Sequence, residues 1–183
     1  IKTNDKICID LEKYLKIKNS LKFEDKFELV NKPLDILYED EYLLIVNKPS
    51  NMPTHPSSDN YTNTLSNIVA NHLKKQGIYN IHIVTRLDKN TTGICIFAKN
   101  EYIQELFVKK KNKINLKKEY TAIVNGIIKE DHIIIEKDIA RMNNTILLRE
   151  TVPTGNGDYA KTEVEVLKRN NNLNYTVVNI ILH

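Results

Sequence analysis

Short β-like segments that follow one another through polar turns are the feature that most constrains this fold. Because most of these segments are joined with no intervening helix, antiparallel pairing is favoured over a βαβ arrangement, which needs a helical crossover. The sequence therefore predicts an α+β fold built on a mixed, largely antiparallel sheet with flanking helices. The segments are continuous apolar runs or alternate apolar and polar residues: 42–46, 81–85, 94–98, 120–124, 132–136, 145–148, 159–167 and 173–182.

Two segments have the apolar period of an α-helix. From 64 to 76, apolar side chains recur three and four residues apart and so fall on one helical face, and Gly77 is suited to the end of this helix. Asn100 is suited to cap a second helix that runs to about Lys111. We expect both helices to flank the sheet.

Composition places the chain among ordinary globular proteins. Of its 183 residues, 41% are hydrophobic and 27% are charged, which excludes a disordered chain. The two cysteines, Cys8 and Cys95, are too few for a disulfide scaffold, so reduced thiols in the cytoplasm are expected. No apolar run approaches the roughly 20 residues of a membrane span, so we expect no membrane partner.

The charge balance permits a nucleic-acid partner without requiring one. The chain has 27 Lys plus Arg and 23 Asp plus Glu, which gives a formal net charge of +4. A lysine cluster has two interpretations that the residues alone leave open: a solvated helix end, or contact with an RNA backbone. Its members are Lys109, Lys110, Lys111, Lys113, Lys117 and Lys118.

Several common catalytic motifs are missing from the printed sequence. There is no GxxxxGK[ST] phosphate loop and no GxSxG nucleophile elbow. The five histidines do not adopt the HExxH spacing, and neither cysteine stands in a CxxC. We therefore expect neither a metal ion nor a nucleotide cofactor.

The segment 84–99 carries the most specific chemistry. Two strand-like pieces flank a polar loop that contains Arg86 and Asp88. Such a loop can present a guanidinium and a carboxylate to a ligand. The other interpretation is that Asp88 forms a turn with its neighbours and Arg86 is a surface charge. From the residues alone both stay open.

Four short motifs stand in order along residues 34–183. Arg86-Leu87-Asp88, two residues, Thr91-Thr92-Gly93 and an apolar strand ending in Ala-Lys resemble the catalytic pattern of the RluA/RluD-type pseudouridine synthases. That family's pattern usually begins with His, where this chain has Thr85. The other three motifs also resemble the family's: Asn47-Lys48-Pro49, the segment 118–126 with its K-x-Y-x-A-x-V-x-G pattern, and Ala160-Lys161-Thr162.

The resemblance implies the pseudouridine synthase catalytic fold and an isomerase that converts uridine to pseudouridine in structured RNA. It implies large-subunit ribosomal RNA as the substrate, with transfer RNA as the alternative. No cofactor is implied, because the isomerisation gains no atoms and involves no net redox change. No obligate protein partner is implied either.

The resemblance also implies roles for individual residues. Asp88 is expected to be the reacting carboxylate, and Tyr120 is expected to stack on the uracil and take its C5 proton. Arg86 is expected to fill the space left by the flipped base or to hold a phosphate. The remaining expectations are RNA contact by Lys109, Lys110 and Lys118, and structural packing beneath the catalytic loop by Lys48 and Pro49.

Domain boundaries follow from the same resemblance. Residues 1–30 are expected to be a remnant of an S4-like RNA-binding module or a linker, and 31–183 to be the catalytic domain. The family's next motif, whose first Arg partners the catalytic Asp, should begin just after His183, and the chain ends within an apolar run. We therefore expect the C-terminal part of the domain to be missing, and this piece to have little activity by itself.

Two other functions remain open. One is an RNA-binding module without turnover, because the chain lacks the expected Arg partner of Asp88. The other is a glycosidase that uses paired carboxylates. No second carboxylate stands in a motif near Asp88, so Asp138 or Glu150 would have to approach it in space.

Overall fold

The computed structural model describes residues 28–57, 62–109, 116–142 and 148–183. The chain divides into two compact units, Ile1–Ile114 and Asn115–His183. Most of the predicted S4-like remnant, Lys110, and most of the predicted strand 145–148 lie outside the described residues.

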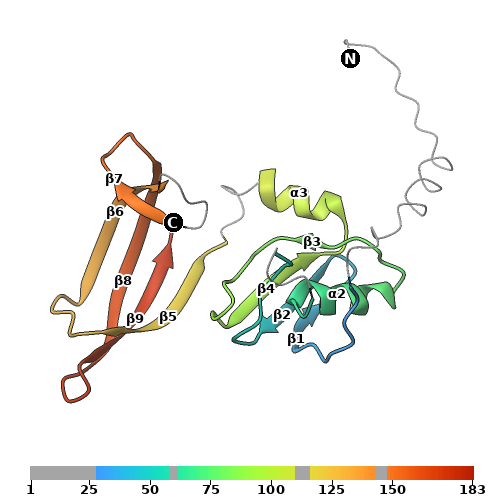
Figure 1. The fold of residues 1–183 in the computed structure, drawn as a ribbon, viewed down its shortest axis with the longest axis horizontal. Coiled ribbons are helices and arrows are strands. Elements are labelled where there is room, and N and C mark those ends of the chain that lie inside the picture. The colour runs from blue at the N-terminus through green and yellow to red at the C-terminus, as the bar shows by residue number, and fades with distance from the viewer. Residues whose placement is uncertain (1–27, 58–61, 110–115, 143–147) are drawn as a thin grey trace, which may run out of the picture. The chain divides into compact units, whose positions relative to one another are not determined.

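The first unit contains a four-stranded sheet in which the strands pair in the order β1-β2-β4-β3 (Figure 1). Every pairing in it is antiparallel. β1 was not predicted, because its sequence mixes exposed apolar side chains with Glu39 and shows no clear alternation. The strands are β1 (Ile36–Glu39), β2 (Leu43–Lys48), β3 (His82–Ile83) and β4 (Gly93–Ala98).

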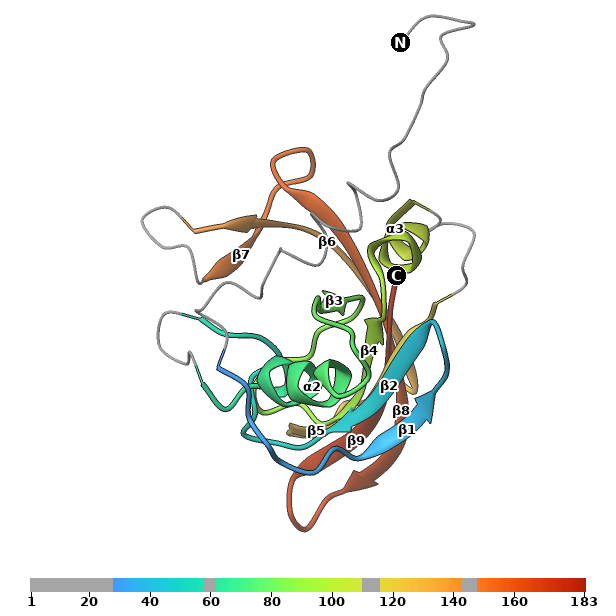
Figure 2. The same cartoon turned by 90° about the vertical axis from the view of Figure 1, so that its right-hand side faces the viewer.

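Helix α2 (Leu65–Lys74) packs on one face of this sheet (Figure 2). Thr64 and Asn67 form a capping box at its start, which satisfies two backbone N–H groups that the helix itself leaves unpaired. The helix predicted over 64–76 is confirmed. Its apolar face joins alternate residues of β2 and β4 in one core: Leu44, Val46, Leu65, Val69, Leu73, Cys95 and Phe97.

Helix α3 (Glu101–Lys109) follows β4 directly. The Asn100 side chain accepts a hydrogen bond from the Ile103 amide at 2.9 Å, as the capping prediction requires. Gln104 donates to the Ile83 carbonyl at 2.9 Å and so attaches the helix to β3. Within the described ranges, neither helix is long and apolar enough to cross a membrane.

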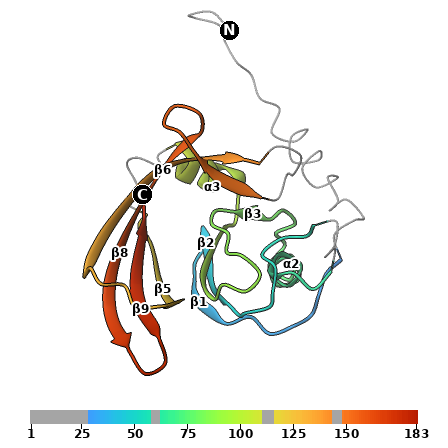
Figure 3. The ribbon, with the colours of Figure 1, turned by 60° about the vertical axis from the view of Figure 1, so that its left-hand side comes forward.

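The second unit contains a five-stranded antiparallel sheet with the order β5-β9-β8-β6-β7. Figure 3 shows β9 lying between β5 and β8. This interior place agrees with the apolar run at the end of the chain, and Thr176 and Val178 on one face of the strand are buried. The strands are β5 (Lys118–Asn125), β6 (His132–Arg141), β7 (Arg149–Val152), β8 (Asp158–Asn170) and β9 (Tyr175–Leu182).

The α+β class and the largely antiparallel pairing are confirmed. In the described residues the strands form two sheets rather than one. The division falls where α3 and the lysine-rich segment after it separate β4 from β5. Each sheet is formed by strands from one side of that division, although β5 and β9 pair from opposite ends of the second unit.

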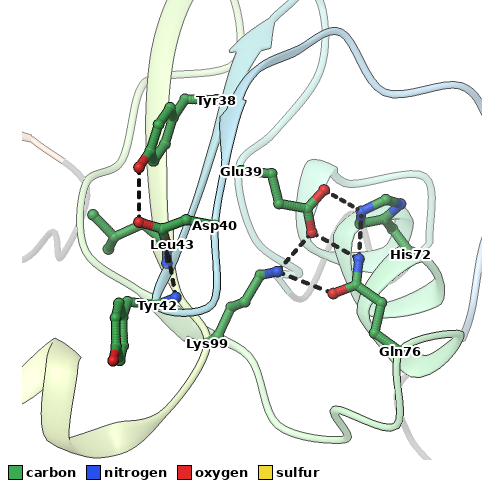
Figure 4. A network of polar contacts seen from close by, with 8 residues as sticks. All are labelled: Tyr38, Glu39, Asp40, Tyr42, Leu43, His72, Gln76 and Lys99. Carbon is green, nitrogen blue, oxygen red and sulfur yellow. Dashed lines mark hydrogen bonds and ion pairs between the residues drawn. The ribbon is translucent and has the colours of Figure 1, made fainter.

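A polar network joins β1, α2 and the residue after β4 (Figure 4). The Glu39 carboxylate accepts hydrogen bonds from Lys99 at 2.8 Å, Gln76 at 2.7 Å and His72 at 2.9 Å. Partial burial raises the pKa of Glu39, but the hydrogen bonds from these three side chains outweigh it and hold the pKa at about 2. The ionised carboxylate therefore stabilises the first unit.

This low pKa predicts a specific dependence of stability on pH. Because the pKa of Glu39 is lower in the folded state, its contribution is complete above about pH 4.5 and is lost as the pH falls towards 2. Between about pH 4.5 and 2, the free energy of unfolding should fall by about 1 kcal/mol less in Glu39→Gln than in the unmodified chain. This value allows for screening by solvent. Urea unfolding of the 183-residue chain at a series of pH values in this window measures it.

Glu41→Gln is the matched control, because Glu41 is an exposed carboxylate in the same turn. It should keep the acid slope of the unmodified chain. Equal slopes for all three proteins would contradict the role given to Glu39.

Candidate active site

The connection from β3 to β4 carries the predicted Arg86 and Asp88. It has no regular secondary structure, and both side chains are exposed. Its start is anchored to β4, since the Val84 amide donates to the Ile96 carbonyl at 2.9 Å and the Ile96 amide donates to the Thr85 hydroxyl at 2.9 Å. The loop therefore presents a carboxylate and a guanidinium from a fixed base.

The ammonium group of Lys48 lies beneath this loop. Lys48 is the last residue of β2 and is fully buried. Its Nζ donates to the carbonyls of Met52 at 2.7 Å, Pro49 at 3.0 Å and Lys89 at 3.1 Å. These bonds use all three ammonium hydrogens, as a buried cation requires. Since Lys89 directly follows Asp88, Lys48 connects the loop that carries Asp88 to the 49–52 loop.

Burial and two neighbouring groups act on the charge of Lys48. Burial lowers the pKa of Lys48, whereas Asp88 and Cys95 act to raise it. Burial raises the pKa of the Cys95 thiol, which is therefore neutral at pH 7. Burial and these two neighbours thus act in opposite directions on the charge of the Lys48 ammonium.

Thr54 holds the residue that separates Arg86 from Asp88. Its buried hydroxyl donates to the Leu87 carbonyl at 2.6 Å and accepts from the Leu87 amide at 3.2 Å. The Leu87 side chain packs against the core of the first unit. Gly93, which ends the loop, has a φ of +119°, a conformation that favours glycine.

The first unit thus brings together Lys48, Pro49, Arg86 and Asp88. Pro49 is exposed, and it contacts the Lys48 ammonium through its carbonyl. Thr54 was not among the predicted site residues. The only sequence signal was its place within a polar loop. The sequence does not distinguish a buried threonine in such a loop from an exposed one.

The other predicted residues lie elsewhere in the chain. Tyr120 is half-buried on β5 of the second unit, opposite Ile180 of β9, and Lys118 is exposed at the start of the same strand. Lys109 is the last residue of α3, where it forms an exposed ion pair with Glu105 at 2.6 Å. This pair contributes little to stability and leaves Lys109 accessible.

The two carboxylates named for the glycosidase alternative are both in the second unit. Asp138 is buried, and its Oδ2 accepts a hydrogen bond from the Gly155 amide at 2.6 Å. It thus holds the turn between β7 and β8, whereas Glu150 is exposed on β7. Among the described residues, no group of three or more His, Cys, Asp or Glu side chains is arranged to hold a metal ion.

Removing the Lys48 ammonium should destabilise the first unit. Lys48→Met keeps the length of the side chain but takes a charged donor from three carbonyls. We expect it to lower the free energy of unfolding by about 3 kcal/mol, measured by urea unfolding. Lys74→Met, at an exposed position of α2, should change it by less than about 0.5 kcal/mol. Similar values for the two variants would show that the buried bonds contribute little.

The chain is similar in sequence to RNA pseudouridine synthases. A family model described as RNA pseudouridylate synthase matches residues 42–183. An uncharacterized RNA pseudouridine synthase of Bacillus subtilis, YhcT, is 36% identical over 75% of this chain and 45% of its own length. The ribosomal large subunit pseudouridine synthase D of Neisseria meningitidis serogroup B is 36% identical over 80% of this chain and 39% of its own length.

Solved structures agree in fold. Human RNA pseudouridylate synthase domain containing 4 has a TM-score of 0.61 and 22% identity, over 80% of this chain and 58% of that one. Human RNA pseudouridylate synthase domain containing 1 gives 0.62 and 20%, over 82% of this chain and 58% of that one. The chain spans under half the length of the curated relatives named above. The family model covers most of this chain, which therefore belongs to the RNA pseudouridylate synthase family.

Proposed function

We propose that the protein carrying this chain isomerises uridine to pseudouridine within RNA, with Asp88 as the reacting carboxylate. The observation that carries the proposal is the loop from β3 to β4. Asp88 is exposed there, while Lys48 and Thr54 hold the backbone on either side of it. An accessible carboxylate on a fixed backbone is what attack on a bulky nucleoside requires.

The reaction rearranges one nucleoside and conserves its atoms. The N1–C1′ bond breaks, the uracil turns, a C5–C1′ bond forms, C5 loses a proton and N1 gains one. A carboxylate can serve as nucleophile or can stabilise the positive charge that develops on the sugar. Asp88 takes this part, and the balanced isomerisation needs no metal ion or redox cofactor.

We assign three supporting roles to other residues. The target nucleotide has to leave the RNA stack, and the exposed guanidinium of Arg86 fills the space that it vacates or holds a phosphate. Tyr120 stacks on the uracil and takes the C5 proton through its phenol oxygen. Lys109, Lys110 and Lys118 contact the RNA backbone.

We propose large-subunit ribosomal RNA as the substrate, in the cytoplasm. The name of the Neisseria relative, ribosomal large subunit pseudouridine synthase D, supports this choice. A transfer RNA is the competing substrate. Mapping pseudouridine in cells that lack the gene distinguishes them, since the missing site falls in one RNA or the other.

Asp88→Asn should abolish product formation without loss of RNA binding. Asparagine keeps the shape of the side chain but can neither form the covalent bond nor stabilise the charge. We expect the single-turnover rate of the complete natural protein to fall by at least about a thousandfold. RNA affinity should stay within about threefold, because the lost group acts on the reaction rather than on the RNA backbone.

Asp158→Asn is the matched control, since Asp158 is an exposed carboxylate at the start of β8. It should retain the unmodified rate. An Asp88→Asn rate within about tenfold of the unmodified protein would remove Asp88 from the reaction. Tight RNA binding by the unmodified protein with no pseudouridine would instead favour a binding module.

A further inference from the structure

We propose that Thr54 is a positioning residue, whose hydroxyl sets the backbone that carries both Arg86 and Asp88. This inference rests on the proposed function of Asp88. Thr54 is 3% exposed and lies in the loop between β2 and α2, more than thirty residues before its partner Leu87.

The Thr54 hydroxyl contacts two successive peptide groups. The Leu87 amide belongs to the peptide plane between Arg86 and Leu87, and the Leu87 carbonyl belongs to the plane between Leu87 and Asp88. One hydroxyl accepts from the first plane at 3.2 Å and donates to the second at 2.6 Å. It therefore restrains the rotation of the backbone on both sides of Leu87.

A hydroxyl is chemically required for this task. It has one donor hydrogen and two acceptor lone pairs, so one oxygen can serve an amide and a carbonyl together. Valine has the shape of threonine but neither function. Serine keeps both functions and loses only a methyl group.

Thr54 is itself fixed by the start of α2. Its carbonyl accepts from the Ser66 amide at 3.0 Å and from the Ser66 hydroxyl at 2.7 Å. The Leu65 amide donates to the Pro53 carbonyl at 2.9 Å. Because α2 is packed into the core, Thr54 connects the loop that carries Asp88 to that core.

This role differs from that of Lys48. Lys48 donates to the carbonyl of Lys89, which follows Asp88. Removing the Lys48 ammonium would leave three carbonyl groups without their donor. Removing the Thr54 hydroxyl leaves the cation site intact and frees the peptide planes around Leu87. Small displacements of a reacting group lower the rate of the chemical step far more than they lower substrate binding.

The test compares Thr54→Val, Thr54→Ser and the control Thr176→Val in the complete natural protein. Thr176 is buried too, and its hydroxyl makes the same two kinds of bond with other peptide groups: it donates to the Gly126 carbonyl at 2.8 Å and accepts from the Ile128 amide at 3.1 Å. The readouts are the single-turnover rate on the RNA substrate, the RNA dissociation constant, the free energy of unfolding and the hydrogen exchange of the Leu87 amide.

We expect Thr54→Val to lower the rate of the folded protein about 10- to 100-fold with an unchanged RNA dissociation constant. The Leu87 amide should exchange at least about tenfold faster, since it loses its acceptor. Thr54→Ser should restore both to within about threefold. Thr176→Val should lower stability and leave the rate of the folded fraction unchanged.

Two results would overturn the inference. One is an unchanged exchange rate for Leu87 in Thr54→Val, which judges the contact whether or not the protein is an enzyme. The other is a rate loss in Thr54→Val that matches its loss of folded protein, as in the control. Failure of the proposed function is distinct from both, because the unmodified protein would then form no pseudouridine on any RNA tested.

Discussion

The buried ammonium of Lys48 joins two loops of the first unit, one of which carries Asp88. The Lys48 ammonium, at the end of β2, receives its three partners from two loops, and one of those partners is the residue after Asp88. A buried ammonium without partners would cost several kcal/mol, so the folded state strongly favours keeping both loops bonded to it. The end of β2 thereby determines the position of the loop that carries Asp88.

The rest of the site extends from this point. Thr54, two residues after Met52, binds Leu87 on the other side of Asp88, and its carbonyl receives the start of α2. The loop is thus connected to β2 through Lys48 and to α2 through Thr54. Both elements belong to one apolar core. Asp88 stays exposed while its backbone is constrained, a combination that suits a reacting group.

Much of this arrangement could be predicted from the sequence. The helix at 64–76 has a strong apolar period and a capping residue, and the strand at 94–98 is a continuous apolar run, so local chemistry was sufficient. Arg86 and Asp88 were found through a family motif rather than through periodicity. What escaped prediction depends on tertiary contacts: β1, the division into two sheets, and the buried hydroxyl of Thr54. Local pattern carries no information on any of these, because each is set by residues distant in sequence.

The proposed mechanism requires this loop to present Asp88 to the reacting nucleoside while Lys48 and Thr54 hold its backbone. A crystal structure of the complete natural protein with RNA that carries 5-fluorouridine at the target site tests it most directly, because fluorine at C5 blocks the final proton loss. We expect an Asp88 carboxylate oxygen within about 3.5 Å of a carbon of that nucleoside, or bonded to it. The bonds of Lys48 to Lys89 and of Thr54 to Leu87 should be intact. Two results would rule out this arrangement. One is a nucleoside bound away from Asp88, and the other is a loop that has lost its bonds to Lys48 and Thr54 in order to bring Asp88 to the nucleoside.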